Sequence, residues 1–201
     1  MSNIQIPEEK QQRIVRAAME NFARNGYRKA TMDEIVAAAG ISKGLIFHYY
    51  GSKEKLFLHL YEFAYGFVYE RLVPHFNHDE PDLFERIRLS EKIKIDMMKQ
   101  YPYILDFLIT ARQEDNPELQ RKMKQLSREN YPAWSDSFQK GIDTSKLRDG
   151  IELDRVIRII QWCTNGLLAE YKDGFVLEEV FAEMDIYLDL MKRAFYKEEH
   201  Q

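Results

Sequence analysis

Helix start and stop signals follow one another closely in the first quarter of the chain and leave little choice of fold there. Thr31-Met-Asp-Glu34 is a capping box, in which the Thr hydroxyl and the Glu carboxylate each satisfy a free amide at a helix start. Gly40 ends that helix soon afterwards, and Ser42 is placed to cap a second short helix that ends at Gly51. Two short helices joined by a glycine-containing turn predict a helix-turn-helix.

The second short helix separates its side chains onto two faces. Ile46 and Tyr50 lie four residues apart and are expected to point inward, as are Ile35 and Ala39 on the helix before. The positions expected to face outward are Lys43, Gly44, Leu45, His48 and Tyr49. The ring of Phe47 is expected on the flank between the two faces. Cations and hydroxyls suit phosphates, whereas short, apolar or hydrogen-bonding side chains suit base edges. This face therefore fits the major groove of DNA.

The rest of the chain is also patterned as helix, which predicts an all-α fold of about nine helices. A first helix is expected from Pro7 to Gly26, and a long one from Lys53 to about Val73. Further helices are expected at residues 82–100, 102–113, 117–140, 154–172 and 177–197. We expect two domains: a three-helix DNA-binding domain at 1–52 and a larger ligand-binding and dimerisation domain at 53–201.

Composition narrows the class of protein. The longest stretch without a charged residue, Ile159–Ala169, is far shorter than the ~18–20 apolar residues that span a bilayer. Cys163 is the single cysteine and cannot form an intramolecular disulfide. We therefore expect a cytoplasmic protein with no membrane partner. The formal charge is +3 over residues 1–55 and −7 over the remainder, so the N-terminal part remains suited to nucleic acid.

The stretch "TMDEIVAAAGISKGLIFHYYGSKEKLF" resembles the DNA-binding segment of the TetR family of bacterial transcriptional regulators, over roughly residues 10–57. The resemblance implies that these residues meet DNA: Thr31, Ser42, Lys43, Gly44, Leu45, Phe47, His48, Tyr49 and Lys53. Leu45 and His48 would read the base sequence, and the hydroxyls and lysines would contact phosphates. Phe47 and Gly51 stand where the family often has Tyr and Lys, which implies fewer phosphate contacts.

The last two predicted helices each carry apolar residues on two faces, and a helix of this kind must bury both. One face suits the helix's own domain and the other a second copy of the chain, although full burial within one chain is the alternative. The TetR resemblance implies a four-helix dimer interface here. The residues expected in it are Gly166, Leu167, Ala169, Phe181, Met184, Leu188 and Met191.

Aromatic residues are dense in the larger part of the chain and are expected to line a cavity between helices. The predicted pocket residues are Tyr61, Tyr65, Tyr103, Phe107, Trp134, Phe138, Trp162 and Asn165. A pocket of rings with few polar groups suits a small, largely apolar or aromatic effector. The alternative for each ring is that it simply fills a core.

Other chemistry finds little support in the sequence. His75 and His78 lie beside Asp79 and Glu80, but they follow a proline in a loop and lack a second cluster with ligand spacing. No nucleophile–base array or phosphate-binding glycine loop has a recognisable context. We expect no enzymatic activity, no metal and no cofactor.

Together these features predict a ligand-responsive DNA-binding regulator. It is expected to be a repressor that binds a near-palindromic operator as a homodimer and is released by a small-molecule effector. Two alternatives stay open: a helical sensor or carrier with a weak DNA-binding domain, and a DNA-binding regulator without an effector.

Overall fold

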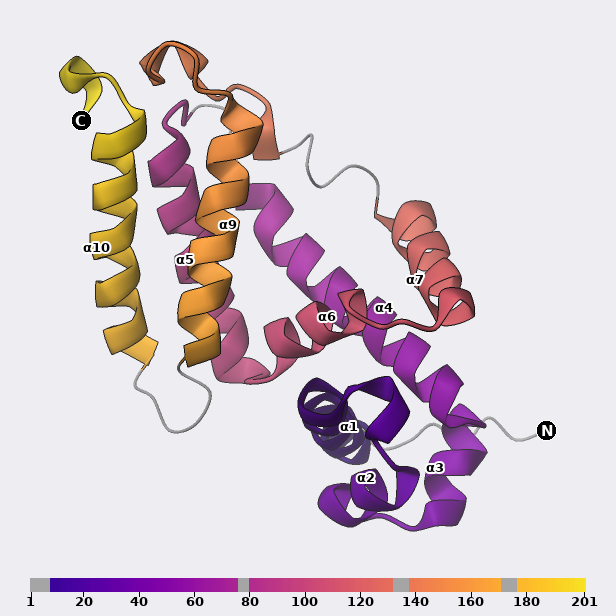
Figure 1. The fold of residues 1–201 in the computed structure, drawn as a ribbon. Helices are drawn as coiled ribbons and strands as arrows, with labels where there is room; N and C mark the ends of the chain where they lie inside the picture. The colour runs from indigo at the N-terminus through magenta and orange to yellow at the C-terminus, as the bar shows by residue number, and fades with distance from the viewer. Residues whose placement is uncertain (1–7, 76–79, 132–137, 171–176) are drawn as a thin grey trace. The chain divides into compact units, whose positions relative to one another are not determined.

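The computed structural model describes residues 8–75, 80–131, 138–170 and 177–201. Within these ranges the chain forms α-helices and short 3-10 turns, and the only β pairing there is an isolated bridge between Leu147 and Tyr196 (Figure 1). The predicted all-α class is confirmed. By its internal contacts the chain divides into two compact units, Met1–Val73 with Asp96–Ser135, and Pro74–Ile95 with Asp136–Gln201. The domain boundary expected after residue 52 stays a prediction.

The first unit begins with the three helices of the predicted helix-turn-helix domain, which we call the recognition unit. They are α1 (Glu8–Lys29), α2 (Met32–Ala39) and α3 (Lys43–Tyr50). The first helix does not stop at Gly26 as expected. Gly26 adopts φ 69° and ψ 171°, which interrupts the helix, but one further turn follows before the chain enters α2.

The same unit holds α4 (Lys53–Leu72), α6 (Ile104–Arg112) and α7 (Pro117–Asn130). Rings from α1, α4 and α6 form a shared core in this unit: Phe22, Phe57 and Phe107 meet at centroid distances of 5.0–6.3 Å. The prediction of one helix over 117–140 is wrong at its end. Tyr131 leaves the helix with φ −140° and ψ 80°, and the reason is in the sequence, because a residue before proline avoids helical geometry.

The second unit is built on α9 (Leu153–Glu170), α10 (Leu177–Phe195) and the first part of α5 (Leu83–Gln100). These three helices lie side by side (Figure 1) and enclose one apolar core. The buried residues of that core are Leu83, Phe84, Ile87, Leu147, Val156, Ile160, Leu167, Val180, Met184, Leu188 and Tyr196.

A buried polar cluster ties the end of the chain to the start of α5. Asp82 accepts hydrogen bonds from the amides of Phe84 and Glu85 and lies 3.1 Å from Nζ of Lys146. The Tyr196 hydroxyl accepts from the amide of Leu83 at 3.1 Å, and burial raises the pKa of this hydroxyl. The Asp82 carboxylate and the Tyr196 hydroxyl therefore both have hydrogen-bond partners, as buried polar groups require.

Candidate nucleic-acid interface

Hydrogen-bonded caps fix the start of each helix around the predicted DNA surface. The Thr31 hydroxyl accepts from the amide of Glu34, and the Glu34 carboxylate accepts from the amide of Thr31, both at 3.2 Å. These bonds from Thr31, with one from Asn21, lower the pKa of Glu34. Ser42 caps α3 at 3.3 Å and Ser52 caps α4 at 3.1 Å. The caps predicted from the sequence are confirmed.

A left-handed glycine sets α3 against α2. Gly40 has φ 62° and ψ 42°, and its amide donates to the carbonyls of Val36 and Ala37. The amide of Ile41 then donates to the carbonyl of Val36 at 3.2 Å, which closes the turn. A side chain at Gly40 would be strained at this φ, because L-residues rarely adopt the left-handed region.

The two faces of α3 are separated as the spacing predicts. Ile46, Ile35 and Ala39 are buried between the helices, whereas Lys43 and His48 are exposed. The other expected outward positions are at least partly exposed: Gly44, Leu45, Phe47 and Tyr49, and so is Thr31 at the start of α2. These predicted DNA contacts are therefore accessible in the folded chain, while their roles at DNA remain predictions.

Tyr50, which was expected to point inward, is only partly buried. Its ring lies 5.3 Å from that of His59 on α4, and its hydroxyl oxygen is buried without a hydrogen-bond partner among the described residues. Burial raises the pKa of the Tyr50 hydroxyl. The α3–α4 contact therefore relies on ring packing more than on hydrogen bonding.

The two lysines expected to bind phosphate both have partners within the protein. Nζ of Lys43 lies 2.6 Å from Oδ1 of Asp33. Nζ of Lys53 donates to the carbonyl of Arg28 at 3.3 Å and lies 4.7 Å from the centre of the Tyr27 ring. Burial lowers the pKa of Lys53, although Glu114 acts in the opposite direction. Sequence reasoning did not find Asp33 as a partner, because the contact joins residues on two different helices.

Polar contacts also tie the recognition unit to Tyr103 and α6, and α4 to α7, within the same compact unit. Arg24 donates to the Tyr103 hydroxyl at 2.6 Å, and the Thr110 hydroxyl donates to the carbonyl of Ala23 at 3.2 Å. Lys122 of α7 lies 2.5 Å from Glu54 in the first turn of α4. The helix that follows the recognition unit therefore starts at a point held by α7.

The residues predicted to line an effector pocket do not share one environment. Phe107 fills the core between Phe22 and Phe57, whereas Trp162 is 67% exposed on α9. The assignment of these two rings to an effector pocket stays a prediction. Tyr103 is engaged by Arg24, Phe138 packs against the core of the second unit and Asn165 is exposed.

Two other predicted pocket residues, Tyr61 and Tyr65, do lie together. Their ring centres are 5.8 Å apart on α4, and Tyr65 also contacts Tyr131 at the end of α7. Burial raises the pKa of both α4 tyrosines. Trp134 lies outside the described residues.

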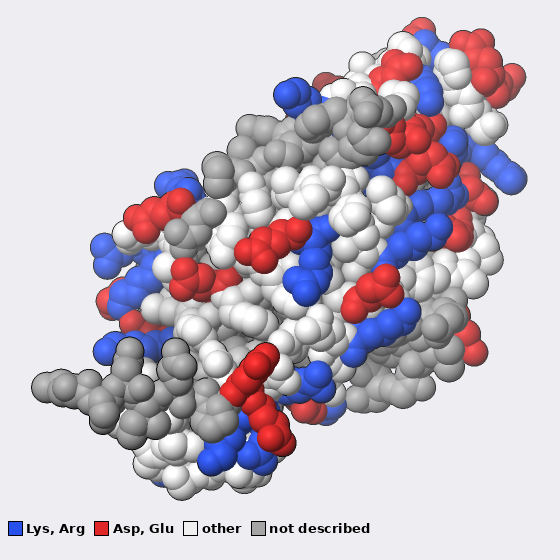
Figure 2. Space-filling model, turned by 180° about the vertical axis from the view of Figure 1, so that it is seen from behind, with Lys and Arg blue, Asp and Glu red and all other residues white. Residues whose placement is uncertain are grey.

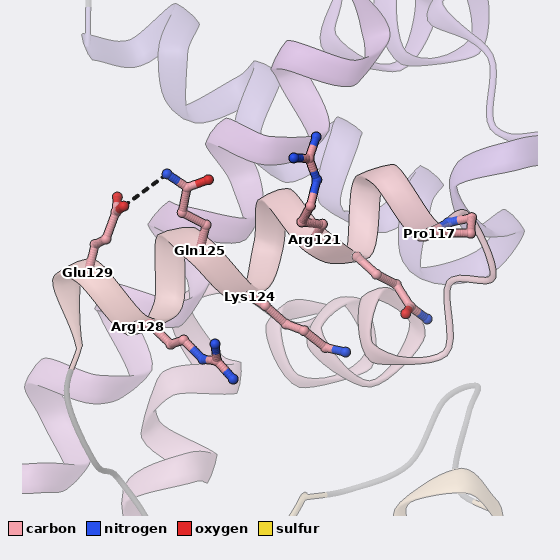
Figure 3. A pocket seen from close by; sticks show the side chains of 7 residues that line it. Pro117, Arg121, Lys124, Gln125, Arg128 and Glu129 are labelled. Atoms are coloured by element: carbon pink, nitrogen blue, oxygen red, sulfur yellow. Dashed lines mark hydrogen bonds between the residues drawn. The ribbon is translucent and has the colours of Figure 1, made fainter.

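A pocket with different chemistry occurs along α7 (Figure 3). The described residues around it all come from this helix and are mostly polar: Pro117, Gln120, Arg121, Lys124, Gln125, Arg128 and Glu129. Gln125 donates to Glu129 at 2.9 Å. None of the residues predicted for the effector pocket is among them.

Three of the residues predicted for the dimer interface lie on the inner faces of α9 and α10. Leu167, Met184 and Leu188 are buried in the core of their own unit, so a partner cannot reach their side chains. Phe181 and Met191 are partly buried, Gly166 is exposed, and the side chain of Ala169 is not described. Among the described side chains of α9 and α10, the large apolar ones left exposed are Trp162, Ile186, Tyr187 and Leu190. We call these four residues the apolar face.

Charge and ligand chemistry elsewhere are unremarkable in the described ranges. Figure 2 shows Lys and Arg lying next to Asp and Glu across the face turned to the viewer. Among the residues with described positions, no group of three or more His, Cys, Asp or Glu is arranged to hold a metal; His78 and Asp79 lie outside them. None of the described helices is long and apolar enough to cross a bilayer.

Comparison with known proteins finds a family match over part of the chain. Residues 14–60 match the family described as bacterial regulatory proteins, tetR family. The matched segment covers the recognition unit from within α1, together with the start of α4. The chain thus carries a segment that matches the TetR family over its recognition unit.

The relatives of this chain are named as regulators. The fatty acid metabolism regulator protein of Bacillus subtilis (strain 168) is 24% identical over 176 residues, which is 85% of each chain. The transcriptional repressor AcnR of Corynebacterium efficiens is 46% identical over 54 residues, 27% of this chain and 29% of its own. Identity to AcnR over this short segment is therefore higher than identity to the Bacillus subtilis protein over the longer alignment.

Solved structures of TetR-family proteins share the fold along most of the chain. The ketosteroid regulator KstR2 of Mycobacterium tuberculosis has a TM-score of 0.71 and 19% identity, covering 96% of this chain and 98% of its own. FadR of Bacillus subtilis in complex with stearoyl-CoA has a TM-score of 0.64 and 18% identity, covering 90% and 97%. The family resemblance and the helical architecture inferred from the sequence are confirmed.

Proposed function

We propose that this protein is a ligand-responsive transcriptional repressor of the TetR family that binds a near-palindromic operator as a homodimer. The observation that carries the proposal is the capped α2–turn–α3 arrangement, which exposes one cation, one imidazole and one hydroxyl-bearing ring along α3. Such a helix enters the major groove and reads bases with its exposed face. A regulator of this kind acts where the DNA is, which supports a cytoplasmic location.

We assign the contacts by chemistry. Thr31, Ser42 and Tyr49 offer hydroxyls to phosphate oxygens, and Lys43 and Lys53 offer ammonium groups once they leave their partners within the protein. The positions that meet base edges along the exposed side of α3 are Gly44, Leu45, Phe47 and His48. An imidazole can form hydrogen bonds with bases, and the apolar side chains fit thymine methyl groups.

Dimerisation through the apolar face would bring two recognition units to one operator. Trp162, Ile186 and Leu190 are each more than half exposed in the single chain, and large exposed apolar side chains of this kind suit a protein contact. Because a two-fold dimer presents the same α3 twice, its preferred site is a near-palindrome. Each half-site then needs only modest affinity.

Acyl-CoA thioesters are the first effector class to test. Support comes from the Bacillus subtilis relative named for fatty acid metabolism and from the solved FadR complex with stearoyl-CoA. An effector can release the operator only if it binds the DNA-free arrangement more tightly, and a difference of ~1–3 kcal/mol is typical. The α4 helix is covalently continuous with the recognition unit and would transmit the change.

In vitro selection from a randomised duplex library tests the proposal. We expect enrichment of a near-palindromic duplex. The logarithm of the protein's affinity for it should fall linearly with the logarithm of the salt concentration, because phosphate contacts release counterions. The selected duplex, bound to protein, is then titrated with stearoyl-CoA, with coenzyme A and stearate as matched controls. Release by the thioester alone supports this effector class.

Two outcomes would favour the alternatives. Ligand binding without any enriched duplex, repeated on protein refolded free of ligand, indicates a sensor with a weak DNA-binding domain. An enriched duplex that no thioester releases indicates either another effector or none, and the assignment to acyl-CoA fails.

A further inference from the structure

A carboxylate on α2 holds the first cation of the predicted recognition helix. Oδ1 of Asp33 lies 2.6 Å from Nζ of Lys43, and the two side chains are 72% and 59% exposed. Lys43 is the first residue of α3. The pair therefore bridges α2 and α3 on the surface that the proposed function turns towards DNA.

Helix capping does not explain the position of this carboxylate. Thr31 and Glu34 already form the reciprocal capping box at the start of α2. The hydrogen bonds described at this helix start involve those two side chains, and the described partner of the Asp33 carboxylate is Lys43. An acidic residue in a first turn also complements the helix dipole, but it does so without an ion pair to a second helix.

We propose that Asp33 competes with DNA phosphate for Lys43 and thereby limits the phosphate-driven part of DNA binding. The inference rests on the proposed DNA-binding function. A carboxylate and a phosphate oxygen are the same kind of acceptor for an ammonium group. On any duplex, Lys43 must leave Asp33 before it can contact phosphate, and the freed carboxylate then lies close to the polyanion.

Lys53, the second lysine predicted to bind phosphate, also has partners within the protein. The Lys43 charge that Asp33 holds is therefore a larger fraction of the positive charge available to DNA. Lys53 donates to the Arg28 carbonyl and lies over the Tyr27 ring. With both lysines held, the DNA-free protein offers little unpaired positive charge at these two positions. An exposed ion pair is weak, so phosphate can displace the carboxylate when the duplex docks.

The test measures salt dependence on the selected operator and on a scrambled duplex of equal length. We expect Asp33→Asn to bind both duplexes about two- to fivefold more tightly, the range that an exposed ion pair supports. Its log–log salt slope should steepen, and Lys43→Gln should bind more weakly with a shallower slope. The two changes together should amount to about 0.9, the increment for one phosphate contact, because the wild-type carboxylate offsets part of the Lys43 charge. Adding Asp33→Asn to Lys43→Gln should leave the slope of Lys43→Gln unchanged.

A matched control removes an equally exposed ion pair elsewhere. Glu152 and Arg155 lie 2.9 Å apart at 67% and 76% exposure, so Glu152→Gln removes the same charge from the second unit. This control should leave the slope at the wild-type value. Thermal unfolding of Asp33→Asn should match the wild type, which separates the effect from loss of fold.

The outcomes separate the inference from the function on which it rests. Weaker binding by Asp33→Asn, or a slope equal to that of the wild type on a bound operator, overturns the competition between Asp33 and phosphate while leaving DNA binding intact. A wild-type protein that binds no duplex at about 50 mM salt, where phosphate contacts are strong, instead defeats the proposed function itself.

Discussion

Two helix pairs in this protein each leave a face exposed, and the two faces differ in chemistry. The α2–α3 pair exposes Lys43, His48 and Thr31, which are polar and hydrogen-bonding. The α9–α10 pair exposes tryptophan, isoleucine, tyrosine and leucine side chains, the apolar face defined above. The first suits a hydrated polyanion, whereas the second gains free energy only when another apolar surface covers it.

The difference teaches how each face is specified. Local bonds position the α2–α3 pair: a capping box, a serine cap and one left-handed glycine within a short stretch. Long-range packing positions the α9–α10 pair, because its inner side chains meet Leu83 and Phe84 from α5.

Substitutions at Leu188 and Leu190 should have very different effects on stability, although the two residues are only two positions apart on α10. Leu188 is fully buried and Leu190 is 54% exposed. We expect Leu188→Ala to cost about 2–5 kcal/mol of unfolding free energy, because it leaves a cavity, and Leu190→Ala to cost little at concentrations where the chain is monomeric. Chemical denaturation at low concentration measures both, and equal losses would contradict the assignment of faces.

A charge on the apolar face should break self-association without unfolding the chain. Leu190→Glu and Ile186→Glu place a carboxylate where a partner's apolar surface is expected. We expect the dimer dissociation constant to rise at least about tenfold, since burying an unpaired charge is costly. Analytical ultracentrifugation measures it, with Glu183→Gln on the same helix as a control. An unchanged constant would place the dimer interface elsewhere.

Gly66 on α4 should be far less replaceable than Gly166 on α9. A Cβ at Gly66 would lie 2.2 Å from the Tyr131 hydroxyl, whereas nothing lies within 4 Å of one at Gly166. We expect Gly66→Ala to cost about 1–3 kcal/mol through overpacking, and Gly166→Ala to gain up to about 1 kcal/mol of helix propensity in the monomer. Thermal unfolding of the two variants provides the comparison, and Tyr131→Ala should rescue Gly66→Ala.

Asp82 should make the second unit sensitive to acid. Burial acts to raise the pKa of its carboxyl, but Lys146, Lys192 and backbone amides outweigh burial, so the pKa is lowered. A group with a lowered folded-state pKa stabilises the protein above its unfolded pKa and loses this contribution as pH falls through the folded value. Asp82→Asn should therefore cost about 1–3 kcal/mol at neutral pH, and less below about pH 4. A constant difference across that range would contradict the role of the charge.

Thr31 should contribute a smaller, local effect. Thr31→Ala removes the hydroxyl that accepts from the amide of Glu34. We expect a loss of about 1 kcal/mol in unfolding free energy, the usual value for a helix cap, together with weaker operator binding if the hydroxyl also meets phosphate. Thr31→Ser keeps both functions and serves as the control. Hydrogen exchange in α2 reports the first effect and operator affinity the second.

Much of the recognition unit could be read from the sequence because its information is local. Thr31, Gly40 and Ser42 each act on amides within a few residues, so their spacing fixes where α2 and α3 begin and end. The same rule explains the failure at α7, where a proline after Tyr131 carried the signal that the predicted helix 117–140 ignored. The ion pair of Asp33 with Lys43 had no such signal.

The sequence by itself determined the helical class, the helix-turn-helix, and the fact that α9 and α10 have two apolar faces. Only the tertiary structure decided which face is inside: Leu167, Met184 and Leu188 inward, Trp162, Ile186, Tyr187 and Leu190 outward. The spacing of apolar residues shows that their side chains share a helix face. It does not show which face is buried, because the hydrophobic effect is non-directional. The inner face is chosen by the partner helices, and those are brought near only when the chain folds.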